Sequence, residues 1–348
     1  MGAYKSSRAR NRPLTIISIV GAAIFFLVYL LSSSPSTAKV TKRPDASVGG
    51  AKSIIRHQLN GLSASWNSFE NKERVLILTP IARFYEEYWN NLCNLNYPHE
   101  LIEIGFILPR GREANQALLR IESAVKALQT GPKKNRFGKV TILRQDFESP
   151  FSQSEKDRHA LSGQKERRAA MARARNSLFT TTIHPQISWV LWLDADIVET
   201  PATLIQDLAA HDKSIIVANC YQRYVEHGES KIRAYDFNSW QDSDTAAQMA
   251  NEMGEDDVIF EGYAEMATYR TLMAYLYVPG NDVHEEVPLD GVGATALLVK
   301  ADVHRDGAMF PPFPFYHLLE SEGFTKMAKR LGYDAFGLPN YLVYHYNE

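Results

Sequence analysis

The chain has 348 residues, of which 45% are hydrophobic and 22% are charged, and its formal net charge is −2 at pH 7. This is the composition of a globular protein with enough apolar residues for a sizeable core, and it lacks the basic excess with which nucleic-acid-binding proteins neutralise phosphates. Two cysteines, Cys93 and Cys220, are too few for a disulfide framework. They form either one bridge or, as is more usual, two buried thiols.

The N-terminal region has the features of a membrane anchor. Residues 14–31 read LTIISIVGAAIFFLVYLL and contain no charged side chain. A helix of this length is about 27 Å long, close to the thickness of a thin bilayer. Basic residues precede it and stay on the cytoplasmic side, so we expect 1–13 to be a cytoplasmic tail and the rest to be lumenal. A cleaved signal peptide is the alternative, although the apolar run is long for one. Residues 32–70, rich in Ser, Pro, Gly and Lys, are expected to be a stem.

Residues 71–348 are expected to form one globular domain. Short apolar runs alternate there with amphipathic segments, which predicts buried strands alternating with helices. This order indicates a Rossmann-like α/β fold with a mainly parallel sheet covered by helices on both faces. In such sheets ligands bind beyond the carboxyl ends of the strands. The expected strands are 75–78, 101–108, 140–143, 188–193 and 215–218, and the expected helices are 82–95, 113–129 and 167–181.

The sharpest motif is Asp194-Ala-Asp196, which directly follows the apolar run 188–193. Carboxylates two residues apart on an extended chain point to the same side, so both can bind one hard divalent cation, Mn²⁺ or Mg²⁺. Such a cation stabilises the charge that a diphosphate leaving group develops as a glycosidic bond breaks. The motif therefore predicts a metal-dependent glycosyltransferase with a nucleotide-sugar donor.

Two other interpretations of this motif stay open. Two Asp residues at a strand end are also typical of a solvated turn or a helix cap. The segment Asp194-Ala-Asp196-Ile-Val198 further fits the DxDx(T/V) pattern of haloacid-dehalogenase-like phosphatases, in which the first Asp is a nucleophile and the second a general acid. That nucleophile normally follows the first strand of its domain, whereas a long α/β pattern precedes Asp194, which favours sugar transfer.

From Arg74 to Glu348 the sequence resembles the fungal Golgi mannan polymerase subunits, which are α-mannosyltransferases with a GT-A-type fold. The resemblance implies GDP-mannose as the donor and transfer with retention of configuration. It implies an α-1,6 linkage, or in some members α-1,2, to mannose of an N-glycan mannan acceptor, and assembly with homologous subunits in the Golgi membrane. The alternative is a scaffolding subunit that stabilises an active homologue. The blocks that carry the resemblance are VLILTPI (75–81), RRAAMARARN (167–176), WVLWLDADIVETP (189–201), the long stretch from VPLDGVGATALLVKADV at 287 to GY at 333, and GLPNYLVYHYNE (337–348).

The resemblance assigns the metal to three residues. Asp196 is the expected ligand, with Asp194 beside it or binding the donor ribose. His345 lies in a strand-like segment near the C-terminus, where GT-A enzymes often place a histidine that completes the metal shell. Neutral imidazole is a suitable Mn²⁺ ligand. Without the resemblance, a single His among apolar residues would be read as a core residue.

Donor binding is expected at the ends of two other elements. Thr79 and Pro80 end the first strand, where such folds usually receive the nucleoside, although they also simply stop the strand. Arg175 and Asn176 close a basic helix, and the resemblance places them near the nucleotide. Arginine is suited to bidentate contact with phosphate. Most of the other arginines of this helix are expected to form a solvated face.

The candidates for the reacting centre are carboxylates. Asp290 opens the turn Asp-Gly-Val-Gly, whose glycines permit close approach of a ligand. Glu320 and Glu322 begin an expected helix, where acidic residues also serve as caps. Asp236 and Trp240 are candidates for holding the acceptor, since indole rings stack on sugars, but Trp240 fits equally well in a core. The sequence does not choose between a double displacement and a front-face reaction, so no nucleophile is named.

Overall fold

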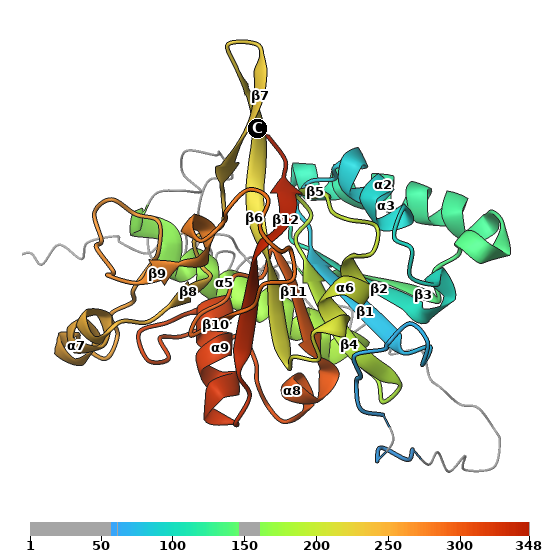
Figure 1. Ribbon diagram of the computed structural model, residues 1–348. Helices are drawn as coiled ribbons and strands as arrows, with labels where there is room; N and C mark the ends of the chain where they lie inside the picture. The colour runs from blue at the N-terminus through green and yellow to red at the C-terminus, as the bar shows by residue number, and fades with distance from the viewer. Residues whose placement is uncertain (1–56, 61, 146–160, 348) are drawn as a thin grey trace, which may run out of the picture. The chain divides into compact units, whose positions relative to one another are not determined.

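The computed structural model of the chain describes residues 57–60, 62–145 and 161–347 (Figure 1). The predicted cytoplasmic tail and anchor, and most of the predicted stem, lie outside these residues. Within the described part, no helix is long and apolar enough to cross a membrane.

The described strands form a ten-stranded sheet whose main path runs β10-β12-β6-β11-β4-β1-β2-β3, with β5 paired to β12 and β7 to β6. The neighbours β4, β1, β2 and β3 are parallel, as are β6 and β12, whereas β11 is antiparallel to both β4 and β6. The sheet is therefore mixed, and the predicted parallel strands β4, β1, β2 and β3 form one end of its path. The strands are β1 (Arg74–Pro80), β2 (Ile102–Leu108), β3 (Lys139–Arg144), β4 (Ile187–Leu193), β5 (Ile197–Glu199), β6 (Ile215–Glu226), β7 (Glu229–Ala234), β10 (Val287–Leu289), β11 (Ala296–Lys300) and β12 (Ala335–His345).

Helices cover both faces of this sheet, as the alternation of elements predicted (Figure 1). On one face lie α2 (Glu86–Cys93), α3 (Arg112–Thr130) and α6 (Leu204–Ala210). On the other lie α5 (Gln164–Thr182), α8 (Ala301–Arg305) and α9 (Glu320–Arg330). The segment between β7 and β10 adds α7 (Asp244–Glu252) and a small second sheet of β8 (Trp240–Gln241) and β9 (Thr271–Leu272).

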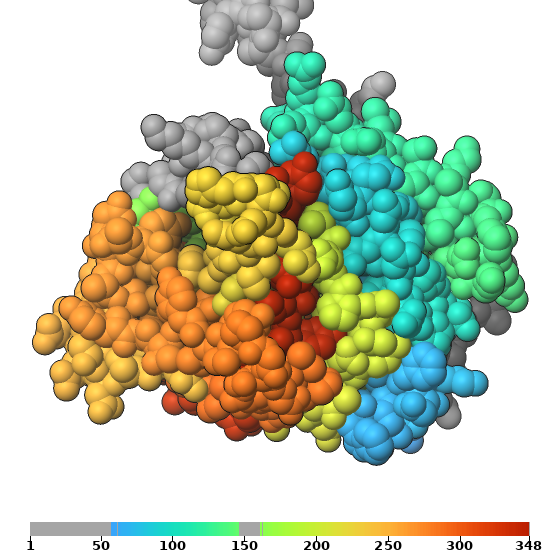
Figure 2. Space-filling view, turned by 45° about the horizontal axis from the view of Figure 1, so that its top comes forward, coloured from blue at the N-terminus to red at the C-terminus, as the bar shows by residue number. Residues whose placement is uncertain are grey.

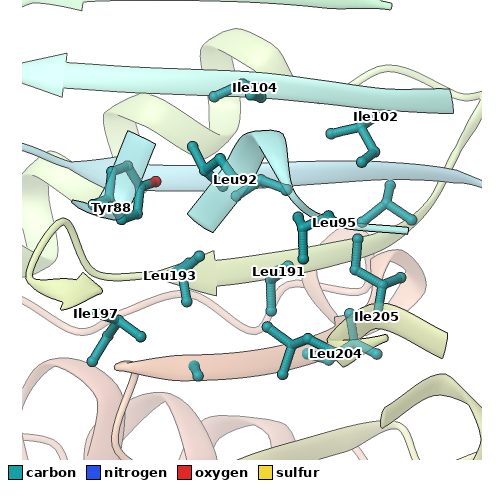
Figure 3. Packing of buried hydrophobic residues seen from close by; sticks show 14 of the residues in the cluster. Tyr88, Leu92, Leu95, Ile102, Ile104, Leu191, Leu193, Ile197, Leu204 and Ile205 are labelled. Atoms are coloured by element: carbon teal, nitrogen blue, oxygen red, sulfur yellow. The ribbon is translucent and has the colours of Figure 1, made fainter. Parts of the chain in front are cut away.

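Strand β4 shows why its sequence is apolar without a break. All seven of its residues are buried. Side chains alternate between the two faces of a strand, so Leu191 and Leu193 pack beneath α2 and α6, while Val190 and Trp192 face α5, α8 and α9. Figure 3 shows the first of these layers, in which Leu191 and Leu193 lie among side chains from neighbouring elements: Tyr88, Leu92, Ile197, Leu204 and Ile205.

Each predicted strand and helix is found, with differences at the ends. The predicted helix 82–95 is the shorter α2. The predicted strand 215–218 continues as β6 to Glu226, because its polar second half pairs with β7 in a hairpin that extends beyond the sheet (Figure 1). The part of the strand after Gln222 is mostly exposed and is held by ladder hydrogen bonds with β7, so hydrophobic pattern could not reveal this end. Both cysteines are free: Cys220 is buried and Cys93 is partly so.

Candidate active site

Asp194 and Asp196 emerge at the carboxyl end of β4, as the sequence predicted. The backbone N–H of Asp194 donates to the carbonyl of Thr295, 3.0 Å away, and the N–H of Ile197 donates back to the carbonyl of Asp194. A tight turn into β5 follows. The two carboxylates remain 29% and 22% exposed, although the strand before them is fully buried. The motif therefore presents its charges at the edge where α/β sheets bind ligands.

Backbone pairing brings His345 to this edge. Its strand, β12, pairs with β5 so that His345 lies opposite Ile197, and the N–H of Tyr346 donates to the carbonyl of Asp196 over 2.7 Å. The His345 Nε2 is then 3.0 Å from Asp196 Oδ2. Its Nδ1 donates to the carbonyl of Tyr346 (2.6 Å), and the ring of Tyr235 stacks on the imidazole. Burial works to lower the pKa of His345, but the carboxylate of Asp196 outweighs it, so the pKa is raised.

Asp196 and His345 offer one oxygen and one nitrogen ligand, a set that fits Mn²⁺. The hydrogen bond at Nδ1 fixes the imidazole so that Nε2 faces Asp196, which is how histidine ligands are usually oriented. Among the residues described, no group of three or more His, Cys, Asp or Glu is placed to hold a metal ion. Asp196 and His345 by themselves are therefore only a partial set of ligands for such a cation.

Arg175 of α5 joins the motif to the start of α9. Its guanidinium is 2.8 Å from Asp194 Oδ1 and 2.5 Å from Glu320 Oε1, and it lies over the rings of Trp192 and Phe310. Burial works to lower the pKa of Arg175, and the two carboxylates raise it above its ordinary value. Burial raises the pKa of Asp194 to about 6, although the guanidinium opposes this.

The hydrogen bonds of Arg175 are incomplete. Its Nη1 is buried and has no hydrogen-bond partner among the described residues, and the Oε1 of Glu320, although close to Nε, lacks hydrogen-bond geometry. Buried donors are almost always paired in folded proteins. A phosphate oxygen is the partner that an arginine donor suits best. Arg175 lines the cleft beside Asp194, so its guanidinium is the arginine group best placed to meet an anion there.

Glu320 is in a strained conformation at the same place. Its φ is 51°, a left-handed value that non-glycine residues rarely adopt and that costs about 1–3 kcal/mol. Glu322, two residues on, is fully buried, receives the guanidinium of Arg168 at 2.6 Å and accepts a hydrogen bond from Trp240. Burial raises its pKa against the pull of Arg168. Glu320 thus faces the site, whereas Glu322 holds the structure behind it.

Some of these residues line a cleft of about 610 Å³, a volume typical of small-molecule sites, but Asp196, His345 and Glu322 do not. Asp194, Arg175 and Glu320 lie on its wall together with Asp236, which accepts hydrogen bonds from the backbone of Asn238 and the hydroxyl of Thr295. In Figure 2 the green surface of α5 is recessed between the yellow β6–β7 hairpin and the orange segment that follows α7. Of the predicted reacting-centre residues, Asp236 and Glu320 therefore meet at the cleft.

The predicted Asp290 does not line this cleft. Its carboxylate is 2.6 Å from Lys329 and accepts the N–H of Asp242. Burial works to raise the pKa of Asp290, but the hydrogen bond from Lys329 prevails and lowers it. Asp290 therefore forms an ion pair with α9 at the surface, which is a structural role.

The glycines after Asp290 do permit a close approach, but by protein side chains. A Cβ on Gly293 would lie 1.9 Å from Asp236 Oδ2, and a Cβ on Gly291 would lie 2.3 Å from the ring of Trp240. Trp240 is only 1% exposed. It therefore belongs to the core, which was the alternative to stacking on an acceptor.

Thr79 and Asn176 are engaged with the protein itself. The buried hydroxyl of Thr79 donates to the carbonyl of Leu193 over 2.7 Å, so it ties the end of β1 to the end of β4. The side-chain amide of Asn176 bonds both backbone groups of Phe310. Thr79, Pro80 and Asn176 do not line the cleft. The bond from Thr79 holds the end of β4 directly before Asp194, whereas Phe310, the partner of Asn176, does not line the cleft either.

Sequence reasoning did not single out Arg168, because most of the other arginines of this helix were expected to form a solvated face. Its side chain is 13% exposed and binds Glu322 and Asn238. The spacing of seven residues from Arg175 was the available signal, because residues seven apart lie on one helix face. Arg173, off that face, is exposed. Other cleft residues, for which no local pattern existed, are Gln222, Arg233, Asn238, Glu261, Tyr263 and Thr295.

Comparison with known proteins finds relatives over nearly the whole chain. The family model Anp1 matches residues 53–314. The chain is 50% identical over 349 residues to "Mannan polymerase complex subunit mnn9" of Schizosaccharomyces pombe, covering 100% of both. It is 56% identical over 297 residues to "Mannan polymerase complex subunit MNN9" of Candida albicans, covering 85% of this chain and 80% of that protein.

Solved structures resemble the chain more distantly. "Mannosyltransferase PcManGT from Pyrobaculum calidifontis in complex with GDP-Man and Mn2+" is 11% identical with a TM-score of 0.40, covering 83% of this chain and 60% of the other. A structure of GalNAc-T7 with UDP, GalNAc and Mn²⁺ gives 12% identity and a TM-score of 0.41, covering 80% and 44%.

Proposed function

The chain belongs to the Anp1 family, and on that premise we propose that it is a metal-dependent, retaining α-mannosyltransferase that uses GDP-mannose. The acceptor in this proposal is the mannan of N-glycans, and the linkage is α-1,6. The match confirms the family resemblance that the sequence blocks predicted. Relatives named as mannan polymerase complex subunits support a role in mannan synthesis together with homologous subunits. The proposal includes the Golgi membrane as location, with residues 14–31 as anchor and the catalytic domain lumenal.

One observation carries the proposal: charged groups from three distant parts of the chain meet at the carboxyl edge of the sheet. Asp194 and Asp196 follow β4, Arg175 comes from α5 and His345 from β12. Asp196 and His345 would hold the cation, which when bound neutralises the charge of the departing diphosphate. Arg175 lines the cleft, where its guanidinium would meet a phosphate oxygen, and it keeps Asp194 in place. This combination suits a nucleoside diphosphate leaving group better than a buried structural ion pair.

The cleft also contains groups that could bind the acceptor sugar. Glu320 and Asp236 are carboxylates that can accept hydrogen bonds from sugar hydroxyls and so orient an acceptor. In a front-face reaction the acceptor oxygen bonds to the anomeric carbon as the bond to the phosphate breaks, and the acceptor proton passes to the leaving phosphate. That route requires no enzyme nucleophile, so the two carboxylates act here by positioning. The phosphatase alternative is disfavoured because β1, β2 and β3 precede β4 along the chain.

The test is mannose transfer by the purified full chain, from GDP-mannose to a short α-mannoside with Mn²⁺. Wild type is compared with Asp196→Ala and with Asp334→Ala as a matched control. Asp334 is exposed and directly precedes β12, so it lies at the opposite end of that strand from His345. We expect product from wild type and the control and none from folded Asp196→Ala.

Other outcomes separate the alternatives. A folded protein that binds GDP with Mn²⁺ but forms no product alone, and whose Asp196→Ala variant leaves the activity of the assembled complex unchanged, would be a scaffolding subunit. Failure to bind GDP would remove the donor assignment, and phosphatase activity would then be tested on the same protein.

A further inference from the structure

The β6–β7 hairpin brings an arginine to the wall of the cleft. Strand β7 pairs with β6 so that Arg233 lies opposite Gln222, and β6 pairs with β12 so that Gln222 lies opposite His345 (Figure 1). Residues that face each other in this way project from the same face of a sheet. The backbones of Arg233 and His345 are therefore two strand spacings apart, roughly 10 Å. Arg233 and Gln222 both line the cleft.

Hydrogen bonds join these three positions. Nε and Nη2 of Arg233 both donate to Oε1 of Gln222, the first over 2.8 Å. The amide nitrogen of Gln222 donates to the carbonyl of Tyr346 over 2.8 Å. The same carbonyl accepts the N–H of Nδ1 of His345, whose Nε2 faces Asp196. Gln222 is only 4% exposed. Its amide therefore holds the guanidinium in a fixed position relative to the pair of Asp196 and His345.

Among the described residues, four arginines line the cleft, and they differ in their partners. On α5, Arg168 and Arg175 are both paired with carboxylates. Arg167 bonds to a glutamine of the same helix. Arg233 comes from the hairpin, and in the part of the chain that the structure describes no carboxylate forms an ion pair with it. Its partner is the amide oxygen of Gln222 instead.

Because this partner is neutral, Arg233 keeps its positive charge for a ligand. An amide oxygen orients a guanidinium without cancelling its charge, whereas a carboxylate does both. The ring of Tyr224, with its centroid 5.3 Å from the guanidinium carbon, also leaves the charge in place. Arg233 is exposed, so the N–H groups that Gln222 does not use are open to a ligand. The hairpin thus presents an oriented cation to the cleft.

We propose that Arg233 binds a phosphate group of a nucleoside diphosphate in the cleft. Its planar guanidinium suits the bidentate contact that phosphate oxygens offer. A diphosphate has two phosphates, and Arg175 beside Asp194 already shares its charge between two carboxylates. Arg233 supplies charge for the other phosphate. That the nucleoside is guanosine and carries mannose rests on the proposed function, whereas the phosphate contact itself rests on the hairpin.

The test measures binding of GDP, and separately of UDP, to the purified full chain with Mn²⁺ by calorimetry. Arg233→Gln is compared with Lys231→Gln, which removes an equal charge from the same hairpin, where Lys231 pairs with Glu226 outside the cleft. Arg233→Gln is expected to weaken GDP binding about tenfold, the lower end for a hydrogen bond to a charged group. Lys231→Gln should bind like wild type. Arg233→Lys should recover part of the loss, because the charge returns without the forked donors.

GDP binding that is equal in wild type and Arg233→Gln would overturn this inference and leave the proposed function standing. An equal loss in Lys231→Gln would also overturn it, since the general charge of the hairpin would then explain the effect. A wild-type chain that binds UDP but not GDP, and needs Arg233 to do so, would keep the phosphate contact and remove GDP-mannose as the donor. Binding of neither nucleotide would overturn both.

Discussion

His304 is expected to make the stability of the domain sensitive to mild acid. Its imidazole is buried among aromatic rings, with Phe179 and Phe324 at centroid distances of 4.5 and 4.9 Å. Its Nδ1 donates to the carbonyl of Ala308, and its Nε2 accepts the indole N–H of Trp192. These two hydrogen bonds require the neutral imidazole, because a proton on Nε2 would remove the acceptor for the indole N–H of Trp192. Burial accordingly lowers the pKa of His304 to about 4.

The sign and size of the effect follow from linkage. The unfolded chain takes up this proton near pH 6.5, whereas the folded chain does so only near pH 4. The contribution of His304 is therefore complete above pH 6.5 and is lost as the pH falls from 6.5 towards 4. For these two pKa values, the free energy of unfolding falls by about 2 kcal/mol between pH 7.5 and pH 5.0 on account of this residue alone.

Urea unfolding of wild type and His304→Gln at both pH values isolates this contribution. Glutamine carries a donor and an acceptor but does not titrate. Its effect on packing is the same at both pH values, so it cancels in the difference between the two unfolding free energies of the variant. We expect wild type to lose about 2 kcal/mol more than the variant on acidification. Equal losses in the two proteins would refute the reasoning, since they would mean that His304 is not held neutral.

Three further predictions concern the site. Arg175→Met should lower the free energy of unfolding by about 3–5 kcal/mol, because the nearly buried Glu320 and the partly exposed Asp194 lose their cation. Adding Glu320→Gln should restore part of this loss in the same urea assay. Gly293→Ala should slow mannose transfer by about a hundredfold while the protein stays folded, because a carboxylate oxygen 1.9 Å from the new methyl group must move. Mannose transfer should stop when EDTA is added and return with Mn²⁺. His345→Ala should raise the Mn²⁺ concentration needed for half-maximal activity by at least about tenfold. An unchanged Mn²⁺ dependence would remove His345 from the metal site.

The fold was predictable where burial alone decided the structure. Strand β4 is buried on both faces, so its apolar run was readable without knowledge of its neighbours. The second half of β6 is held by pairing with β7, and its alternation of polar and apolar residues carries no comparable signal. The sequence also did not reveal that β11 is antiparallel between β4 and β6, because strand direction depends on how distant segments return to the sheet.

The site was predictable where a local motif exists. Asp194 and Asp196 are two residues apart and could be found by spacing alone. His345 was placed beside them through the family resemblance, and the structure supplies the physical reason in the pairing of β5 with β12. Asp236 and Asp290 looked alike in the sequence, yet one lines the cleft and the other pairs with a surface lysine. No local feature distinguishes such carboxylates, since their surroundings come from other elements.

The ion pairs of α5 determine which substitutions test the reaction and which mainly change the stability of the fold. Arg168 binds Glu322 behind the cleft, and Arg175 binds Glu320 and Asp194 within it, so this one helix face links the metal motif to the start of α9. Removing any member leaves a buried charge without its partner, and the resulting loss of stability would be mistaken for a loss of catalysis. Asp196 differs because its partner, a histidine, can become neutral when the carboxylate is removed. Loss of transfer in Asp196→Ala therefore reports on the reaction more directly than any substitution in the arginine network.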